Sequence, residues 1–434
     1  MFAVFLPSLN FRGNSTPYLW WFYKFVSELG AQAAYICGEE YFFDPGEHHA
    51  AGRPDVSNGF ATSFGFAIPN IETLAVLARH GIPNHVWRSL EDRFPSNPLA
   101  AFQDFCLQKN ELLGAAIFES LDQITQTHGK VEAVLTCVNC VTLAELCRTR
   151  DVPLIHVELG ALRRPHFPLT AYFDFSGVNG GTEARARFTA AEDALKSDGW
   201  GNLKALQGLF FSTAPQEGLC PDVDLGLALQ VEDDSNVICY SNRFSSSSLI
   251  NDAQIRLAQG AIAAPVLVRS HPGSLFSVRN ISPEFVADTS ETSLQFVSRC
   301  KRIHTINSSV AVEALLHGRE VFVFGESSFG FCIDPLTHRI NGPATAFFLL
   351  NYLVPWDIAF SSDYLRFRLA RPSEERIREV HLEQFMQKKI ELLETRIDAL
   401  EEQITQIKSS LSWRITQPLR TLLKVLRQVK ARVR

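Results

Sequence analysis

The first residues of this 434-residue chain lack the features of a targeting signal. Residues 1–7 are apolar but include no basic residue, and the run is too short for a signal peptide or a membrane span. We expect a first β-strand there. A disulfide framework is also lacking, because the nine cysteines are odd in number and scattered, a pattern that indicates a reducing compartment. The sequence therefore predicts a cytoplasmic protein.

Metal-ligand patterns are few and incomplete. Cys137 and Cys140 have C-x-x-C spacing, but no second Cys/His pair at zinc spacing follows, and Cys137 ends an apolar run in which a free thiol is usually buried. Asp222 and Asp224 form an Asp-x-Asp pattern just before a short apolar run. We expect neither pattern to bind a metal, and no cofactor is predicted.

Acidic and basic residues are unevenly distributed. The formal net charge is −6, yet residues 408–434 contain eight basic residues and no acidic one, so the remainder carries −14. An acidic body argues against a nucleic-acid partner, and the basic end favours an anionic membrane surface. The composition, 46% hydrophobic and 20% charged, is that of a folded globular chain, and the length predicts two domains with an appendage.

Strand-like apolar runs alternate with helical stretches in two series. The first has apolar runs at 2–6, 33–37, 133–137 and 154–157, with helices near 17–29, 98–128 and 141–149. The second has apolar runs at 236–240, 265–268, 302–306 and 320–324. This alternation predicts an α/β fold of parallel sheets covered by helices, in two Rossmann-like domains at 1–225 and 226–375. The polar segment 230–236 is predicted to link the domains and to run through any cleft between them.

The C-terminal part carries two further patterns. Residues 386–411 have apolar residues at alternating spacings of four and three, which predicts a coiled coil at 376–411 and a homo-oligomer, with a plain surface helix as the alternative. After position 411, Trp413, Pro418 and several leucines alternate with arginine and lysine. Residues 412–434 are therefore predicted to form a basic amphipathic helix that lies on a membrane surface, or else binds an acidic partner protein.

Two polar motifs follow predicted strands of the second series. His271 and Pro272 follow one strand, and Ser308 and Ser309 follow the next strand and begin an amphipathic helix. In open α/β sheets, ligands bind beyond the carboxyl ends of the strands, and a helix N-terminus offers N–H groups to a phosphate. Together the motifs predict a nucleotide-phosphate site, although each alone is also typical of a turn or an ordinary N-cap.

Four segments carry a family resemblance: ELGALRR at 158–164, QVEDDSN at 230–236, SHP at 270–272 and SSVAVEALLHG at 308–318. In order and spacing they resemble the bacterial retaining β-Kdo glycosyltransferases, which build capsular polysaccharides and O-antigens. The resemblance covers about 150–340 well and the N-terminal third in outline. It implies a GT-B fold, two Rossmann-like domains that face each other, and CMP-Kdo as the donor, the activated form of 3-deoxy-D-manno-oct-2-ulosonic acid.

Three carboxylates are the candidates for the catalytic steps. Glu158 follows a predicted strand of the first domain and is suited to take the proton of an acceptor hydroxyl, with an ion pair to a neighbouring arginine as the alternative. The resemblance implies a retaining double displacement, in which Asp233 or Asp234 attacks the sugar. Asp234 is our first choice, because Asp-Ser-Asn resembles the shared core of the family. Asp233 stays open, and so does a purely structural Asx turn.

Donor binding is assigned to the two strand-end motifs together with three arginines and a glutamate. Arg163, Arg164 and Arg269 are cations for the Kdo carboxylate or the phosphate, and each is equally suited to a structural ion pair. Glu313, one turn into the helix, is assigned to a ribose hydroxyl, with a solvated helix residue as the alternative. Loss of CMP leaves a phosphate dianion, so donors are needed where that charge develops.

The leading hypothesis is a membrane-associated glycosyltransferase on the inner face of the inner membrane. It moves Kdo, as a β-linkage, from CMP-Kdo to a lipid-linked glycan. A transferase that uses another CMP-sugar, such as CMP-sialic acid, is the alternative among enzymes, because a fold alone does not set the donor. A nucleotide-binding scaffold that assembles a polysaccharide complex through the coiled coil is the alternative outside them. The motifs leave open the acceptor sugar and the choice between capsule and O-antigen.

Overall fold

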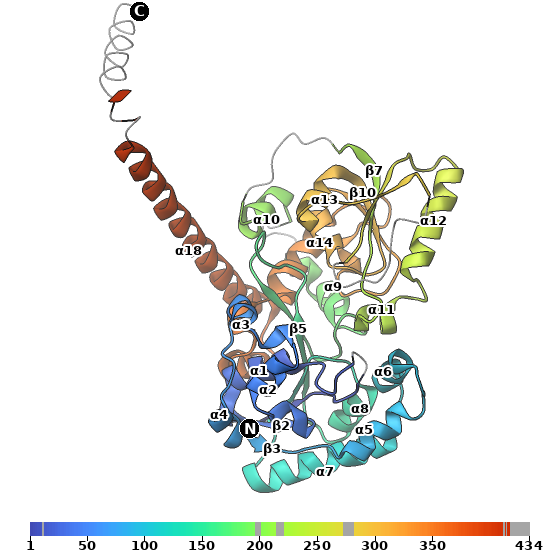
Figure 1. Cartoon of the computed structure of the whole chain (residues 1–434), viewed down its shortest axis with the longest axis vertical. Coiled ribbons are helices and arrows are strands. Elements are labelled where there is room, and N and C mark those ends of the chain that lie inside the picture. The colour runs from blue at the N-terminus through green and yellow to red at the C-terminus, as the bar shows by residue number, and fades with distance from the viewer. Residues whose placement is uncertain are drawn as a thin grey trace, which may run out of the picture. The chain divides into compact units, whose positions relative to one another are not determined.

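The computed structural model describes residues 1–10, 13–195, 201–213, 221–271, 282–410, 413, 415 and 416. Residues Met1–Leu382 form one compact unit, and a second unit begins at Glu383. The first unit contains a seven-stranded and a five-stranded sheet with helices packed around them (Figure 1). We call the seven-stranded sheet and the helices that pack on it the first lobe. The five-stranded sheet and the helices that pack on it are the second lobe.

The first sheet has the strand order β12-β6-β5-β4-β1-β2-β3. Its strands are β1 (Phe2–Phe5), β2 (Ala33–Ile36), β3 (Ala78–Arg79), β4 (Val134–Thr136), β5 (Leu154–Leu159), β6 (Thr170–Asp174) and β12 (Val354–Pro355). The first five run parallel, whereas β6 is antiparallel to β5, and β12 is antiparallel to β6. The strands predicted from apolar runs in this part of the chain are confirmed.

Both faces of the first sheet are buried. Along β1, Phe2 and Val4 lie in one apolar cluster, while Ala3 and Phe5 lie in another, as the two-residue period of a strand requires. The first cluster includes side chains of α1, and the second includes side chains of α5 to α8. The helices before the second sheet are α1 (Leu19–Leu29), α2 (Pro45–Ala50), α3 (Asn58–Phe64), α4 (Ile71–Ala75), α5 (Asn84–Glu91), α6 (Pro98–Leu107), α7 (Glu111–His128), α8 (Val141–Thr149), α9 (Ala184–Leu195) and α10 (Leu203–Phe210).

The second sheet is entirely parallel, with the order β11-β10-β7-β8-β9. Its strands are β7 (Val223–Ala228), β8 (Val266–Arg269), β9 (Phe285–Ala287), β10 (Cys300–Thr305) and β11 (Glu320–Val323). Its core packs Leu225, Leu227, Val266 and Val268 against Leu249 of α12. The helices from here on are α11 (Ser235–Tyr240), α12 (Ser246–Ala258), α13 (Ser293–Arg299), α14 (Val310–Leu316), α15 (Gly342–Phe347), α16 (Trp356–Ala359), α17 (Ser362–Leu369) and α18 (Glu374–Ser409).

The start of the second lobe differs from the prediction. Residues 236–240, predicted as a strand, form α11, because Asp234 is its N-cap and accepts a hydrogen bond from the N–H of Asn236 at Oδ1 (2.9 Å). The first strand of this sheet is β7, so the polar segment 230–236 follows a central strand and does not link the lobes. The predicted helix at 98–128 is two helices, because Asn110 caps α7 through Leu113 N–H (2.9 Å).

The chain returns to the first lobe after the second sheet. β12 pairs with β6, and Trp356, Phe360 and Tyr364 lie in the core of the first lobe. The rings of Trp356 and Trp21 are 5.9 Å apart. Residues 226–375 were predicted to form the second domain, but the end of that range belongs to the first lobe. Apolar periodicity predicts a buried helix face but does not reveal which core covers it.

Helix α18 extends over both units. Its residues up to Leu382 belong to the first unit, so the helix begins earlier than the predicted coiled coil. The predicted basic helix at 412–434 lies outside the described residues, apart from Trp413, Ile415 and Thr416. Within the part of the chain that the structure describes, no helix is both long and apolar enough to cross a membrane.

Candidate functional site

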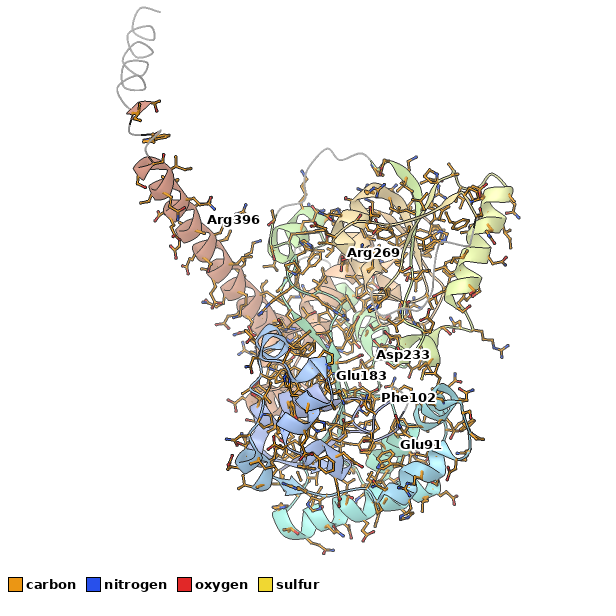
Figure 2. All side chains as sticks on the ribbon, viewed as in Figure 1. Glu91, Phe102, Glu183, Asp233, Arg269 and Arg396 are labelled. Atoms are coloured by element: carbon orange, nitrogen blue, oxygen red, sulfur yellow. The ribbon has the colours of Figure 1, made fainter. Side chains whose placement is uncertain are left out.

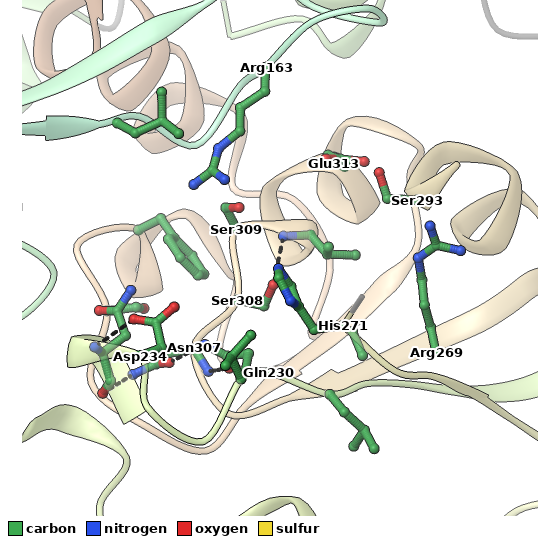
Figure 3. Close-up of a pocket in the computed structure, with 18 of the residues that line it drawn as sticks. Arg163, Gln230, Asp234, Arg269, His271, Ser293, Asn307, Ser308, Ser309 and Glu313 are labelled. Atoms are coloured by element: carbon green, nitrogen blue, oxygen red, sulfur yellow. Dashed lines mark hydrogen bonds between the residues drawn. The ribbon is translucent and has the colours of Figure 1, made fainter. Parts of the chain in front are cut away.

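Three neighbouring strands of the second sheet end at one pocket of about 420 Å³. Ser308 and Ser309 follow β10, Asp234 follows β7, and His271 follows β8 (Figure 3). Because parallel strands end at the same edge of a sheet, residues that are far apart in the sequence meet here. The volume is in the range typical of pockets for small ligands.

Nine of the eleven predicted site residues line this pocket: Glu158, Arg163, Arg164, Asp234, Arg269, His271, Ser308, Ser309 and Glu313. Asp233 is not among the described lining residues, although it adjoins Asp234 on the segment between β7 and α11 (Figure 2). Pro272 lies outside the described residues. Asp234 thus lines the pocket and Asp233 adjoins it, while the charges of both aspartates act on His271.

Asp234 has a structural task as well as a place in the pocket. Its Oδ1 caps α11, so the Asx-type interaction considered as an alternative is present. The segment that carries it is fixed by two side chains that sequence reasoning missed. Gln230 Nε2 donates to Asn307 Oδ1 (2.9 Å), and Asn307 N–H donates to Gln230 Oε1 (2.9 Å).

Asn307 also joins this segment to the loop after β11. Its Nδ2 donates to the carbonyl oxygens of Asn236 (3.1 Å), Tyr240 (3.3 Å) and Glu326 (3.1 Å). Gly325 allows the close approach, since a Cβ there would lie 2.6 Å from the Tyr240 carbonyl oxygen. Asn307 directly precedes Ser308, so its position beside the predicted motif was the available signal.

The residues predicted to donate hydrogen bonds to a phosphate follow two strands: His271 follows β8, and Ser308 and Ser309 follow β10. Ser308 Oγ accepts a hydrogen bond from Val310 N–H at 3.3 Å and thereby caps α14. Ser309 is the N-cap residue by position, but its side chain makes no capping hydrogen bond within the described structure. An ordinary side-chain N-cap therefore does not account for Ser309. Burial lowers the pKa of His271, and the neighbouring Asp234 opposes this shift.

The three arginines differ in their partners. Arg269 is held in an ion pair by Asp288 (Nη1 to Oδ2, 2.6 Å) and donates to the Ser290 carbonyl (3.0 Å), so the structural role considered for it is present. Arg163 donates from Nε to the Gly160 carbonyl (3.2 Å), and Figure 3 shows it reaching from the first lobe toward Ser309. Arg164 adds a further cation to the lining.

Glu313 is a buried carboxyl group in the pocket wall, so the alternative considered for it, a solvated helix residue, is wrong. Within the described structure its Oε2 has no hydrogen-bond partner. Burial raises its pKa to about 7, and the hydroxyl of Ser293 and the charges of Arg163 and Arg269 oppose this rise. An unsatisfied buried oxygen is costly, so a ligand hydroxyl or amine that donates to it would be stabilised.

Glu158 lies on β5 and comes from the first lobe. Asn179 Nδ2 donates to its Oε2 at 2.7 Å. Asn179 has a φ of 67°, which asparagine tolerates better than most residues, and it follows Val178, whose N–H and carbonyl both bond to Asn139. Asn179 is therefore a further residue that sequence reasoning missed, because the contact joins positions far apart in the chain.

The remaining metal-type motifs have other contacts. Asp222 pairs with Arg299 (3.3 Å), and Asp224 pairs with Arg302 (3.2 Å) and accepts from Ala263 N–H (3.0 Å). Cys137 and Cys140 are buried thiols, and burial raises the pKa of each. Among the described residues, no group of three or more His, Cys, Asp or Glu side chains is arranged to hold a metal ion.

The fold and the pocket define a two-lobed α/β protein with a ligand site at the carboxyl ends of a parallel sheet. Residues 4–183 match the glycosyltransferase 99 family N-terminal domain, and residues 227–337 match the capsule polysaccharide biosynthesis protein family. The chain is a glycosyltransferase of capsule polysaccharide biosynthesis, and the family resemblance predicted from its motifs is confirmed.

Solved structures with detectable similarity include two Kdo transferases from Thermosulfurimonas dismutans. KpsC, beta Kdo 2,7 transferase, is 17% identical with a TM-score of 0.39, and the match covers 58% of this chain and 89% of that chain. KpsC, beta Kdo 2,4 transferase, is 18% identical with a TM-score of 0.36, and the match covers 52% and 81%. The glycosyltransferase SnogD from Streptomyces nogalater is 13% identical with a TM-score of 0.26, over 91% of this chain and 99% of its own. No curated protein matches the sequence.

Proposed function

We propose that this glycosyltransferase moves Kdo from CMP-β-Kdo to a lipid-linked glycan, with retention of configuration, in a GT-B arrangement of its two lobes. The observation that carries the proposal is one pocket lined by Asp234, His271, Ser308 and Ser309 of the second lobe and by Glu158 of the first. This set contains a nucleophile, donors for a leaving phosphate and a proton acceptor. These are the groups that a double displacement requires.

In the first step, the carboxylate of Asp234 attacks the anomeric carbon of Kdo. The bond from that carbon to the phosphate oxygen breaks, and its electron pair leaves with CMP. Negative charge grows on the phosphate as this happens, so hydrogen-bond donors lower the barrier most when they are already in place. His271, Ser308 and Ser309 supply those donors.

In the second step, the acceptor hydroxyl attacks the same carbon from the side that CMP has left. The bond to Asp234 breaks, and the hydroxyl proton passes to Glu158. Two inversions at one carbon give net retention. The hydrogen bond from Asn179 orients the Glu158 carboxylate for this transfer.

The other lining residues are assigned to recognition of the donor. Arg163 and Arg164 suit the Kdo carboxylate, because a guanidinium binds a carboxylate through two parallel hydrogen bonds. Arg269, which is already paired with Asp288, adds positive charge near the phosphate. Glu313 accepts from ribose hydroxyls through its buried Oε2.

The test is intact mass spectrometry of the protein with CMP-Kdo and no acceptor. The Glu158→Gln variant is expected to accumulate a mass increase of one Kdo residue, since it forms the adduct but discharges it slowly. Peptide mapping should locate the adduct on Asp234, and the product of the native chain should have retained configuration. An inverted product, or normal transfer by Glu158→Gln, would refute the mechanism.

Donor choice separates the main proposal from its alternatives. We expect turnover of CMP-Kdo and not of CMP-sialic acid by the same preparation. Turnover of CMP-sialic acid alone would move the assignment to a sialyl-type transferase. Binding of CMP without turnover of either donor would favour a scaffold.

Membrane attachment and self-association complete the proposal. Residues 412–434 contain seven basic residues and no acidic one, and each contributes about 1 kcal/mol near an anionic surface. The full chain should therefore sediment with anionic vesicles and not with zwitterionic vesicles. A chain that ends at Ser410 should sediment with neither kind of vesicle. Binding of the shortened chain to anionic vesicles would contradict the assignment to the inner face of the inner membrane through this segment. Self-association is assigned to the heptad segment.

A further inference from the structure

Helix α18 presents one apolar face along the whole of its described length in the second unit. Seven side chains on this face are each between 45% and 55% exposed: Met386, Ile390, Leu393, Ile397, Leu400, Ile404 and Ile407. Their spacing of four and three residues keeps them on one side of the helix. An isolated helix gains nothing from such a face in water, so a partner of the same periodicity is needed to bury it.

The types of residue on this apolar face, which we call the seam, indicate how many helices the coiled coil contains. Ile390, Ile397 and Ile404 occupy the first apolar position of successive heptads, position a. Leu393 and Leu400 occupy the second, position d, in the centre of the face, with Met386 and Ile407 at the same position at its two ends. Isoleucine at a with leucine at d favours a parallel two-stranded coiled coil over trimers and tetramers.

The charged residues beside the seam also indicate a parallel pair of helices, with a second copy of this chain as the partner. Lys389 and Arg396 lie at position g, and Glu394 and Glu401 lie at position e of the following heptads. In a parallel, in-register pair, each g residue faces the e residue five positions later in the other copy. Lys389 then faces Glu394 of the second copy, and Arg396 faces Glu401 of the second copy (Arg396 is labelled in Figure 2).

The antiparallel arrangement lacks this complementarity. When the seam is aligned about its centre, between Ile397 and Leu400, position e of one helix faces position e of the other. Glu394 would then face Glu401, which is a repulsive pair, and Arg396 would face the uncharged Gln403. The charges beside the seam therefore favour parallel pairing with a second copy of this chain over antiparallel pairing.

We propose that residues 386–407 form a parallel, in-register, two-stranded coiled coil with a second copy of the chain. This inference deepens the self-association part of the proposed function and rests on it. In such a dimer both copies of the basic segment 412–434 leave the coiled coil at the same end. Two linked membrane-binding segments bind one surface more tightly than either alone, so dimerisation strengthens the attachment.

The first experiment measures the dimer affinity of the full chain by sedimentation velocity over a concentration series. E394K/E401K replaces four attractive pairs of the dimer with repulsive ones and is expected to weaken dimerisation by about 10- to 100-fold. D398K/E402K is the matched control, because it makes the same change in charge at positions outside the seam, and its affinity should be near that of the native chain. Equal affinities of both variants would overturn the assigned register.

A charge-swap mixture tests the pairing directly. K389E/R396E should also dimerise weakly alone, because its four seam-flanking residues are all acidic. Mixed with E394K/E401K, it should form a heterodimer that is clearly tighter than the homodimer of either variant. In the mixed dimer every g residue faces an e residue of opposite charge, so the repulsive pairs of the two homodimers are absent. No recovery on mixing would overturn the g-to-e pairing.

Orientation is tested with Ile407→Cys. In the proposed dimer position 407 faces itself, so a mild oxidant should join two chains through the introduced thiol, with the native chain as the control for its own cysteines. In an antiparallel dimer the introduced thiol would face position 390, and a dimer that does not cross-link would overturn the parallel arrangement. Transfer to a soluble acceptor is measured in parallel. Its loss in all variants, including the control, would count against the proposed function and not against the coiled coil.

Discussion

The two sheets contribute to the pocket in different ways. The second lobe contributes from three adjacent parallel strands, β10, β7 and β8, whose ends all lie at one edge. The first lobe contributes from β5, whose neighbour β6 is antiparallel, so the chain turns back and carries Arg163 and Arg164 in the turn. A parallel edge gathers many donors around one charged group, whereas a returning loop brings single side chains to face it. The proposed mechanism accordingly places bond cleavage in the donor at the second lobe and acceptor activation at the first.

The strongest test of this division is Asp234→Asn. Asparagine caps a helix about as well as aspartate, so α11 should keep its start while the carboxylate that we propose as the nucleophile is lost. We expect the transfer rate to fall by about 10⁴-fold or more with an unchanged melting temperature. Asp234→Ala should be equally inactive but should also lose about 1 kcal/mol of stability, since the cap is removed.

Asp233→Ala is the matched control for this prediction. It should retain most of the activity, because Asp233 does not line the pocket in the described structure. Initial rates and thermal unfolding of the three variants provide the measurement. An adduct on Asp233, or a nearly active Asp234→Asn, would show that the roles of the two aspartates are misassigned.

A smaller loss is expected for His271→Ala. Removal of one donor to the leaving phosphate should lower kcat/KM for CMP-Kdo by about 100-fold, with the fold intact. His49→Ala, which changes an exposed histidine on α2 of the first lobe, serves as the control and should leave the kinetics unchanged. Unchanged kinetics in a folded His271→Ala protein would show that His271 does not bind the leaving phosphate. The proposed division of tasks between the two lobes would then lose its support.

The strands were predictable where a run was mostly apolar, as in β1 and β8, and where apolar residues were interspersed with polar ones, as in β10. β7 was missed because Gly226 interrupts a short run between polar residues. The glycine is needed there, since a Cβ would lie 2.5 Å from Cys300 Sγ and 2.8 Å from the ring of Phe296. That crowding is a tertiary contact and leaves no periodic signal in the sequence.

The candidate site was predictable in its chemistry but not in its supports. His271 and Ser308 were identified from short motifs at predicted strand ends, and Asp234 was identified from the family resemblance. The pair that fixes their loops, Gln230 and Asn307, is separated by 77 positions in the chain, and no local rule joins them. The prediction of a strand at 236–240 was wrong because five mostly apolar residues fit a strand and a helix equally, and the capping role of Asp234 decides between them.

The buried carboxyl of Glu313 predicts a pH effect within the second lobe. Its pKa in the folded protein is about 7, above the value of 4.5 for a free glutamate, so the folded state holds a proton that the unfolded chain has released. The free energy of unfolding should therefore fall by about 3 kcal/mol as the pH rises from 4.5 through 7, and then level off. In Glu313→Gln this part of the pH dependence should disappear.

Urea unfolding of both proteins at about pH 5 and about pH 8, on either side of the folded pKa, provides the measurement. The native chain should lose more stability between these values than Glu313→Gln does, and the variant should bind CMP more weakly because an amide replaces the accepting carboxylate. Identical pH profiles would mean that Glu313 is not the buried acid described here. A changed profile with unchanged CMP affinity would remove its role at the ribose.

The smallest expected effect comes from a chain that ends at Leu382, within α18. Residues 374–382 belong to the first unit: Glu374 pairs with Arg187 (2.7 Å), and His381 bonds to the Leu350 carbonyl (3.0 Å) and the Tyr364 hydroxyl (2.6 Å). A chain that ends at Leu382 keeps these contacts, so its transfer to a soluble acceptor should stay within about twofold of the native rate, because distant changes rarely couple. A chain that ends at Ser373 removes the Glu374 partner of the partly buried Arg187 and should be destabilised by about 3 kcal/mol. Thermal unfolding and initial rates separate the two chains. A folded but inactive chain ending at Leu382 would make the remainder of α18 part of the active enzyme and would end the separation of catalysis from self-association.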